Sequence, residues 1–331
     1  MVSGEYVVLD GAVAVVAAAE ARAFVRWATE DESAAIRPSA SPTDVRTTGD
    51  DAALPPEVRA TRALAEAQLG LDAADIGGAL RLDVSDLRRD GRKLGLGSSA
   101  AAAAATAGAV FAQAGRNLDD PGVRAAMLAV ALAGHRSVAP EGSGADVAAS
   151  VLGGLVRFRR DPSSGEVCEA TPLALPRAAQ VRVVWTGREA RTSELVRRVR
   201  ALAAASPGAY ARAMGALADA AAALAEACRT DDVTALVAAV AAHHEAMDAL
   251  GRAADAPIVE EGLANAAALA SSFGGAAKPS GAGGGDVALA FFADASAADA
   301  FTQACPGAGL DPVDVALGAP GVRAEPASDP L

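Results

Sequence analysis

The stretch KLGLGSSAAAAAATAGAVFAQAG, residues 93–115, joins a glycine–serine turn to an alanine-rich run. Gly95 and Gly97 allow a tight turn in which the backbone can approach a ligand, because glycine has no Cβ. Ser98 and Ser99 suit the start of a helix, and alanine is the best helix former. Such a helix points free N–H groups and a positive dipole end at its loop. The stretch predicts an anion-binding loop for phosphate; an ordinary capped helix is the alternative.

Composition argues against several classes of protein. The chain has 331 residues, 52% hydrophobic and 21% charged, as in folded proteins with a substantial core. Its net charge of −12 argues against a nucleic-acid-binding surface, which is normally basic. Cys168, Cys228 and Cys305 lack metal-ligand spacing, so we expect a reducing compartment. With neither a secretory signal nor a membrane span in the sequence, we expect a cytoplasmic monomer or homodimer.

Lysine is rare in this chain. Among 29 Lys and Arg residues, only Lys93 and Lys278 are lysine. Both border glycine-rich stretches, which suggests that these two points need a compact ammonium rather than a planar guanidinium. We therefore expect both to be loop cations near bound phosphate.

The remaining sequence predicts a mixture of strands and helices. A hairpin is predicted at 6–9 and 13–19, because Asp-Gly separates two apolar runs. Further strands are predicted at 24–27, within 76–87, at 181–185 and before 292, and a long surface loop at 30–56. Helices are predicted at 57–69, 98–115, 121–135, 192–205, 210–229, 233–250 and 258–271.

A second candidate active-site segment is HRSVAPEGSGAD, residues 135–146. Its glycines and serine precede Asp146, which opens a predicted helix. The carboxylate either takes part in a reaction or merely stabilises the helix dipole. A two-histidine metal site at His243 and His244 is not expected, because adjacent helical residues point about 100° apart.

Familiar nucleotide and hydrolase motifs are missing from the sequence. It contains no Gly-Lys-Ser/Thr of a Walker A loop. The glycines at 95 and 97, followed by Ala100, fit a loose dinucleotide pattern, but residues 88–92 (RRDGR) are not the buried strand that a Rossmann fold requires. Neither a serine nucleophile elbow nor HExxH occurs.

Four segments occur in the order and spacing of a known family. They are GEYVVLDGAVAVVAA at 4–18, KLGLGSSAA at 93–101, GSGADVAASVLGG at 142–154 and KPSGAGGGD at 278–286. Together they resemble the GHMP kinase superfamily across most of the chain. Within it, Lys93, the WTG of 185–187 and Asp286 favour the phosphomevalonate kinases over the mevalonate kinases.

The resemblance implies a two-domain α+β fold, the GHMP kinase fold. Residues 1–178 would form an ATP-binding domain like domain 2 of ribosomal protein S5, and residues 179–331 a ferredoxin-like domain. It implies phosphoryl transfer from ATP, with Mg²⁺, to 5-phosphomevalonate, giving 5-diphosphomevalonate for isoprenoid biosynthesis. The alternatives are a mevalonate kinase or another GHMP small-molecule kinase and, in another class, a nucleotide-binding protein of this fold without turnover.

The resemblance also assigns roles to residues. The catalytic residues would be Lys93, Asp146 and Lys278. The ATP phosphates would bind to Gly95, Leu96, Gly97, Ser98, Ser99 and Ala100, and Ser99 would reach the metal. The substrate-binding residues would be Glu5, Tyr6, His135, Arg136, Ser143, Gly144, Ala145, Arg191, Ser280, Gly281, Gly283 and Asp286.

A phosphate acceptor changes what the site must supply. The second pKa of a phosphomonoester is about 6, so its oxygen is largely ionised at neutral pH and needs no base. Cations and Mg²⁺ must instead bring two polyanions together for transfer. Lys93, Lys278 and Arg136 are the best-placed candidates, with Arg191 behind them. Asp146 would orient the acceptor or a cation.

The chain departs from the family pattern in one segment and differs from the mevalonate kinases at one residue. An Ala-Pro-Gly-Lys strand usually precedes GEY, whereas Met1-Val2-Ser3 precedes Gly4 here, so either the start of the sequence is mis-assigned or another cation substitutes for the lysine of that strand. Mevalonate kinases carry a metal-binding glutamate eleven residues before the aspartate, and this chain has His135 there, as phosphomevalonate kinases do. The sequence assigns no second metal ligand.

Overall fold

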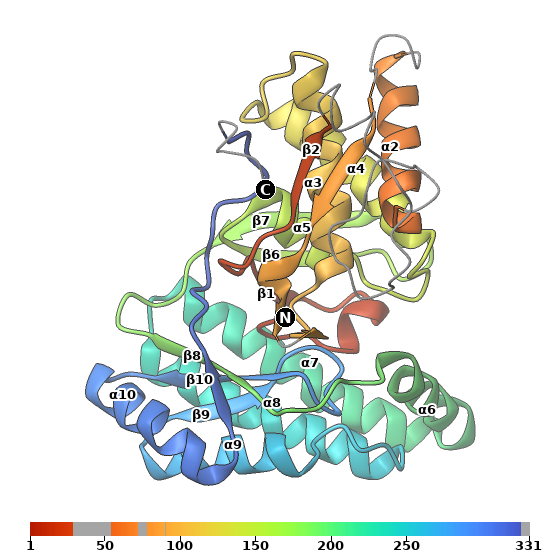
Figure 1. Cartoon of the computed structure of the whole chain (residues 1–331). Helices are drawn as coiled ribbons and strands as arrows, with labels where there is room; N and C mark the ends of the chain where they lie inside the picture. The colour runs from red at the N-terminus through yellow and green to blue at the C-terminus, as the bar shows by residue number, and fades with distance from the viewer. Residues whose placement is uncertain (29–53, 72–77, 90, 326–331) are drawn as a thin grey trace. The chain divides into compact units, whose positions relative to one another are not determined.

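The computed structural model describes residues 1–28, 54–71, 78–89 and 91–325 (Figure 1). By their contacts they form two compact units, each made of two segments. The first unit comprises residues 1–17 and 155–317, and the second comprises residues 18–154 and 318–331. The sequence-based division into two domains at residue 178 differs from this division by contacts, and it stays a prediction.

The second unit is built around an alanine-rich helix. Helix α3 (Ser98–Gln113) contacts each of its neighbours α2 (Pro56–Leu69), α4 (Pro121–Arg136) and α5 (Ala145–Leu152). Most alanines of α3 are buried, and small side chains at a contact allow helix axes to lie close together. An added Cβ at Gly108 would lie 2.3 Å from Val322 Cγ1, so the segment of residues 318–325 packs against α3.

Local sequence explains where these helices begin and end. Gly70, at φ 65°, ends α2 in the left-handed conformation that glycine tolerates. The Asp120 side chain accepts hydrogen bonds from the N–H groups of Gly122 and Val123, and Pro121 occupies the first helical position of α4. These positions confirm the predicted helices at 57–69 and 121–135.

Short antiparallel pairs complete the second unit. Strand β2 (Phe24–Trp27) pairs with β3 (Leu80–Asp83), and β4 (Arg88–Arg89) pairs with β5 (Arg92–Lys93), which ends just before the glycine loop of α3. The strand predicted at 24–27 is confirmed, as is a strand within 76–87. Most of the surface loop predicted at 30–56 lies outside the described residues.

The first unit contains two antiparallel sheets. One has the strand order β11-β8-β10-β9, and the other has the order β1-β6-β7. The strands of the first sheet are β8 (Gln180–Trp185), β9 (Ala276–Pro279), β10 (Val287–Phe292) and β11 (Asp311–Val313). Those of the second are β1 (Ala14–Ala17), β6 (Leu155–Arg160) and β7 (Val167–Leu173).

Helices cover both faces of the sheet that contains β9. Ala277 packs with side chains of α9 (Glu261–Ser272) and α10 (Ala295–Ala304). Side chains alternate along a strand, so the next residue, Lys278, points to the opposite face, where α8 (Val233–Ala253) contacts β9. Helix α7 (Pro207–Arg229) packs on α8, and α6 (Thr192–Ala205) packs on α7. The helices predicted in this half of the chain are confirmed to within a few residues.

Two local predictions are wrong. Residues 6–9 are not a hairpin strand: they form a turn and the 3-10 helix η1 (Val7–Asp10), ended by Gly11 at φ 84°. Tyr6 and Val7 are buried against side chains of α6, α7 and α8, which buries the apolar run without a strand. The residue before α3 is Gly97 rather than a capping serine.

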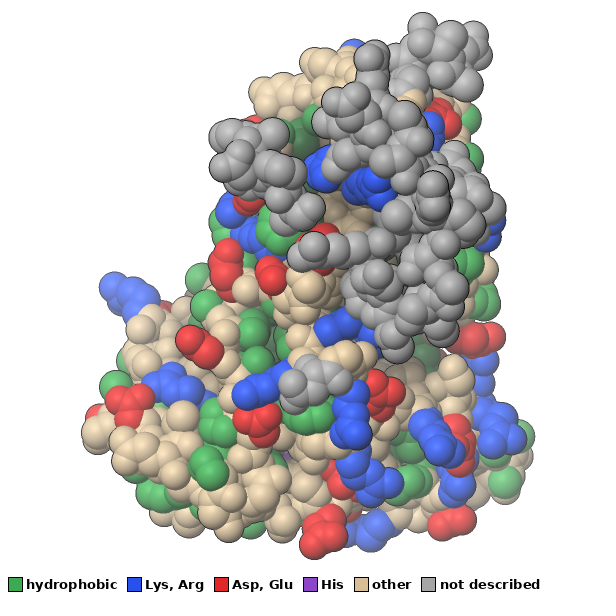
Figure 2. Space-filling model, viewed as in Figure 1, with side chains coloured by type: hydrophobic (Ala, Val, Ile, Leu, Met, Phe, Trp, Pro, Cys, Tyr) green, Lys and Arg blue, Asp and Glu red, His purple; other side chains and the backbone are tan. Residues whose placement is uncertain are grey.

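On the face drawn in Figure 2, basic side chains lie interspersed with acidic ones. Within the part of the chain that the structure describes, no helix is both long enough and apolar enough to cross a bilayer.

Candidate functional site

The loop before α3 presents an open helix N-terminus. Gly95 and Gly97 have φ values of 74° and 81°, a region that other residues rarely adopt. No side chain caps α3, and the first helical hydrogen bond runs from Ala101 N–H to the Gly97 carbonyl. The N–H groups of residues 98–100, at the start of the helix, therefore have no hydrogen-bond acceptor among the described residues. Their arrangement and the helix dipole favour an anion at this point.

Asp146 lies beside this loop. Gly144, at φ 81°, precedes α5 and places Asp146 in its first turn. A Cβ built on Gly97 would lie 3.7 Å from Asp146 Cβ, so two segments far apart in sequence meet. One carboxylate oxygen accepts a hydrogen bond from the neighbouring Val147 N–H at 3.0 Å. A carboxylate so close to an anion site needs a cation to offset the repulsion.

The structure also brings His135 and Ser99 together. His135, at the end of α4, is only 5% exposed, and its Nε2 lies 3.1 Å from Ser99 Oγ. A residue predicted to bind substrate therefore contacts the residue predicted to bind the metal. Among the described residues, no three His, Cys, Asp or Glu side chains converge on one metal position. A cation at Ser99 would consequently need ligands from bound phosphates.

The other predicted residues of the second unit lie around the same loop segments. Lys93 is exposed on β5, and Arg136 is half-buried at the end of α4. The Ser143 hydroxyl accepts a hydrogen bond from Ala145 N–H at 3.2 Å. A Cβ on Gly144 would lie 2.4 Å from Leu132 Cδ2, so this turn packs tightly. Arg191 belongs to the first unit and is exposed just before α6.

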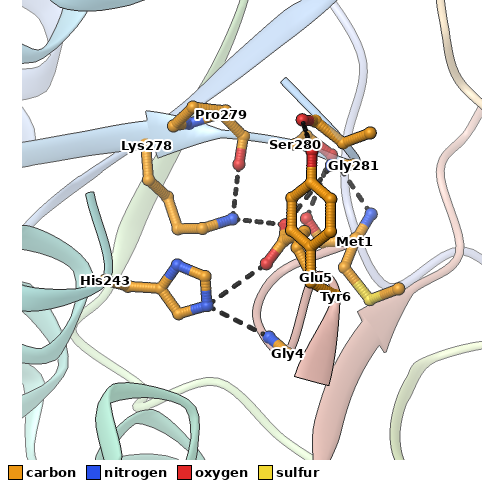
Figure 3. A network of polar contacts seen from close by, with 10 residues as sticks. Met1, Gly4, Glu5, Tyr6, His243, Lys278, Pro279, Ser280 and Gly281 are labelled. Carbon is orange, nitrogen blue, oxygen red and sulfur yellow. Dashed lines mark hydrogen bonds and ion pairs between the residues drawn. The ribbon is translucent and has the colours of Figure 1, made fainter. Parts of the chain in front are cut away.

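A buried ion pair lies in the first unit (Figure 3). Lys278 Nζ is 2.6 Å from Glu5 Oε1, and it also donates a hydrogen bond to the Pro279 carbonyl. The two side chains are 0% and 1% exposed. Lys278 therefore lies inside strand β9 and is not the exposed loop cation that the sequence predicted. The reason is that helices cover both faces of β9, so this lysine needs an internal carboxylate.

Glu5 is the centre of this network. Its Oε1 also accepts a hydrogen bond from Gly281 N–H at 3.3 Å. Burial alone would raise the pKa of Glu5, but the neighbouring Lys278 ammonium outweighs it, so the pKa lies below its ordinary value and the group is a carboxylate. Burial lowers the pKa of Lys278 below its ordinary value, although Glu5 opposes this shift, and its two close acceptors favour the ammonium form.

His243 is a member of the network that the sequence did not predict. Its Nε2 lies 3.1 Å from Gly4 N and 3.2 Å from Glu5 Oε2. Burial lowers the pKa of His243 to about 4, although Glu5 opposes this shift. The imidazole is therefore neutral, accepts the Gly4 N–H at Nε2 and carries its proton on Nδ1. Glu5 Oε2 has no hydrogen-bond donor among the described residues.

A sequence signal for His243 existed. It falls on the buried face of α8 at helical spacing with Leu236, Val240, Met247 and Leu250, all of which are fully buried. A histidine in an apolar stripe must find a polar partner inside the protein. The partner itself could not be deduced, because Gly4 and Glu5 are far away in sequence.

Tyr6 ties the N-terminal motif to the glycine loop after β9. The Val7 N–H donates to the Glu5 carbonyl at 2.7 Å, and Tyr6 between them has φ 64° and ψ −55°. This is the rare, strained type of γ-turn with positive φ. The Tyr6 hydroxyl donates to the Ala282 carbonyl at 2.6 Å. Burial raises the pKa of Tyr6, so the hydroxyl remains a donor.

The glycine loop, residues 281–285, is shaped by close backbone contacts. A Cβ on Gly283 would lie 2.2 Å from the Ile258 carbonyl oxygen, so only glycine fits. Ser280 Oγ donates to the Met1 carbonyl at 3.0 Å. Asp286, at φ 56°, accepts a hydrogen bond from Ala190 N–H and holds the turn after β8. That these residues bind substrate stays a prediction.

Comparison with known proteins identifies the family. Residues 59–154 match the family described as GHMP kinases N terminal domain, and residues 224–309 match GHMP kinases C terminal. Together the two matches cover more than half of the chain. The chain belongs to the GHMP kinases. The resemblance read from the four sequence motifs is thereby confirmed.

Individual GHMP kinases resemble the chain in sequence or in fold. A phosphomevalonate kinase from Streptomyces sp. (strain CL190) is 32% identical over 247 residues, which are 68% of this chain but only 64% of that relative. Streptococcus pneumoniae phosphomevalonate kinase, solved with phosphomevalonate and AMPPNP, matches 96% of each chain at 18% identity and a TM-score of 0.72. The L. major mevalonate kinase, solved with R-mevalonate, matches 92% of this chain and 88% of its own at 21% identity and a TM-score of 0.66. The predicted two-domain GHMP kinase fold is confirmed.

Proposed function

We propose that this GHMP kinase transfers the γ-phosphoryl group of ATP to 5-phosphomevalonate, giving ADP and 5-diphosphomevalonate. The open N-terminus of α3, with Asp146 beside it, is the observation that carries phosphoryl transfer. The Streptomyces relative is named a phosphomevalonate kinase, and its 32% identity supports the choice of acceptor. We place the reaction in the cytoplasm, as the composition suggests.

The loop at residues 95–100 is the proposed site for the ATP phosphates. Its N–H groups and the dipole of α3 would stabilise charge on the phosphate oxygens. Leu96, between the two glycines, would contribute its backbone only. Two basic residues of this unit are proposed to bind phosphate: Lys93, just before the phosphate loop, and Arg136, in the segment that leads to Asp146. In the first unit, Arg191 is the candidate phosphate-binding cation.

Residues beside the loop fit a magnesium ion. The hydroxyl of Ser99 and the carboxylate of Asp146 are hard oxygen ligands, and Mg²⁺ commonly uses only one or two protein ligands plus phosphates and water. A Ser99 hydroxyl that donates its hydrogen to His135 Nε2 keeps its oxygen lone pairs for a cation. Bound there, Mg²⁺ would neutralise charge on the transferring phosphate.

The acceptor is proposed to need positioning rather than deprotonation. Its phosphate oxygen is largely ionised at neutral pH, because the second pKa of a phosphomonoester is about 6. Asp146 then orients a cation or the acceptor. The residues proposed to contact the acceptor include backbone groups of the glycine loop, residues 281–285, which lies in the first unit.

The decisive experiment measures ADP release by the purified protein with Mg-ATP and either mevalonate or phosphomevalonate. We expect turnover with phosphomevalonate and little with mevalonate. Turnover on mevalonate alone would overturn the proposed acceptor. ATP binding without turnover on any acceptor would favour a nucleotide-binding protein that has no kinase activity.

Replacement of Asp146 tests the role of the carboxylate. If Asp146 is not a base, Asp146→Asn should reduce kcat by less than the roughly 100- to 10,000-fold that a general base contributes. Asp86→Asn, which changes an exposed carboxylate of the same unit, is the matched control. Complete loss of activity in Asp146→Asn, with an unchanged melting temperature, would show that a base is required.

A further inference from the structure

The N-terminal turn and the glycine loop are joined within the first unit by hydrogen bonds from the buried side chains of Glu5 and Tyr6 (Figure 3). Glu5 Oε1 accepts the Gly281 N–H at 3.3 Å, and the Tyr6 hydroxyl donates to the Ala282 carbonyl at 2.6 Å. Two consecutive residues of the strained N-terminal turn, Glu5 and Tyr6, thus bind the first two residues of the glycine loop. A loop with several positive-φ residues has many alternative conformations, so such contacts select one of them.

Lys278 has no exposed surface from which to reach a substrate. Its ammonium group already contacts the Glu5 carboxylate and the Pro279 carbonyl. To bind a phosphate, it would have to leave Glu5 as an uncompensated buried charge, which is strongly unfavourable. The geometry therefore gives Lys278 an internal role.

His243 lies beside the other oxygen of the same carboxylate and holds the backbone of the preceding residue. Its Nε2 accepts the Gly4 N–H and lies 3.2 Å from Glu5 Oε2. With a neutral imidazole, a carboxylate and an ammonium, the three side chains have no net charge. The charges of these three side chains thus balance without an external ion.

We propose that Glu5, Lys278 and His243 are positioning residues that fix the backbone of the glycine loop for the acceptor, and that Lys278 does not touch the transferred phosphate. This inference rests on the proposed function, because the loop is taken to bind the acceptor. It replaces the direct catalytic role that the sequence suggested for Lys278.

A mutant cycle separates positioning from phosphate binding. Lys278→Met leaves the buried Glu5 carboxylate without its partner, so its melting temperature and kcat should both fall. In the double variant Glu5→Gln and Lys278→Met, no buried charge remains, and the amide oxygen introduced at position 5 can still accept the Gly281 N–H. We expect the double variant to recover most of the melting temperature and a kcat within about tenfold of the wild type. Recovery of melting temperature with kcat still reduced by about 100-fold or more would overturn the proposal.

Substitutions of His243 test the positioning role through its hydrogen bond with Gly4. In His243→Gln, the amide oxygen can accept the Gly4 N–H and the amide nitrogen can donate to Glu5 Oε2, so activity should be retained. His243→Leu removes the acceptor, and KM for phosphomevalonate should rise about tenfold while KM for ATP changes little. His244→Gln, the adjacent and partly exposed histidine, is the matched control. Equal losses in His243→Gln and His243→Leu, or equal rises in both KM values, would overturn positioning.

Hydrogen exchange gives a readout that does not depend on turnover. Peptides covering residues 280–287 should exchange faster in Lys278→Met and His243→Leu than in the wild type, and at near wild-type rates in the double variant and His243→Gln. Unchanged exchange in both single variants would overturn the positioning role. A wild-type protein that fails to turn over phosphomevalonate refutes the proposed function, and the exchange rates then still decide whether the network orders the loop.

Discussion

At the N-terminus of α3, the loop of Gly95 and Gly97 leaves backbone N–H groups without a side-chain cap, whereas the loop after β9 is held by buried side chains. Both loops are rich in glycine and both have a lysine at their border. Lys93 is exposed and Lys278 is completely buried in an ion pair. The first loop keeps its polar groups open for a ligand, and the second uses them to hold its own shape.

This difference shows that burial decides what a lysine can do. An exposed ammonium lies at the surface, where a phosphate can reach it. A buried one must keep its carboxylate, because an unpaired charge in the protein interior is very costly. The predictions below test this contrast between the open loop and the closed network.

The largest effect is expected from the two lysines themselves. Lys278→Met should lower the free energy of unfolding by about 3–5 kcal/mol, because Glu5 loses its partner. Lys93→Met should change it by no more than about 0.5 kcal/mol, since the side chain is exposed. Urea denaturation measures both. Similar losses in the two variants would contradict the contrast.

In Lys93→Met, activity should fall although stability does not. Lys93→Met should reduce kcat/KM although it leaves stability unchanged, because Lys93 is proposed to act on phosphate. A Lys93→Met protein with wild-type kinetics would remove Lys93 from the site.

Glycine substitutions give the next largest contrast. Gly4 has φ 92°, and an added Cβ would lie 2.5 Å from Ala14 Cα, so Gly4→Ala combines backbone strain with a backbone clash. We expect a loss of about 2–4 kcal/mol. At Gly97 the added Cβ has ordinary contacts, and only the positive φ of 81° opposes alanine, at a cost of about 1–2 kcal/mol. Melting temperatures that fall equally would show that Gly4 is not tightly packed.

The pH dependence of stability tests the neutral state of His243. Burial lowers the pKa of the folded histidine to about 4, compared with about 6.5 when unfolded. Between these values the unfolded chain binds a proton that the folded protein does not. This contribution is therefore present at pH 7 and decreases as the pH falls towards 4.

The expected size is about 2 kcal/mol between pH 7 and pH 5. His243→Gln cannot titrate, so its free energy of unfolding should fall less over this range. The titration of Glu5 and of other carboxylates is common to both proteins, and the difference between them reports His243. An identical decrease in the two proteins would mean that His243 is not buried in its neutral form.

Much of the open loop could be predicted from sequence, because its signals are local. Glycine, serine and alanine in close succession specify a turn and a helix at residues 95–113, and the family resemblance added Asp146. The structure places Asp146 beside Gly97, as a shared site requires. Periodicity likewise gave the long helices.

The closed network could not be predicted, because it depends on contacts between distant segments. Lys278 looks like a loop residue beside glycines, and only the packing of α8 and α9 on β9 buries it. The apolar residues after Tyr6 look like a strand, but a γ-turn directs them into the helical core. No local sequence pattern predicts the strain at Tyr6 or the contact of His243 with Gly4.

The smallest effect concerns a single hydroxyl of the closed network. Tyr6→Phe removes the donor to the partly buried Ala282 carbonyl and should cost about 1 kcal/mol of unfolding free energy. Tyr210→Phe is the matched control: its hydroxyl donates to Asp10, which is exposed, so water can replace the bond and the loss should stay below about 0.5 kcal/mol. Tyr6→Phe should also speed hydrogen exchange at residues 281–285, and Tyr210→Phe should not. If both substitutions cost the same and neither alters exchange, the Tyr6 contact does not order the loop, and Glu5 alone joins it to the N-terminal turn.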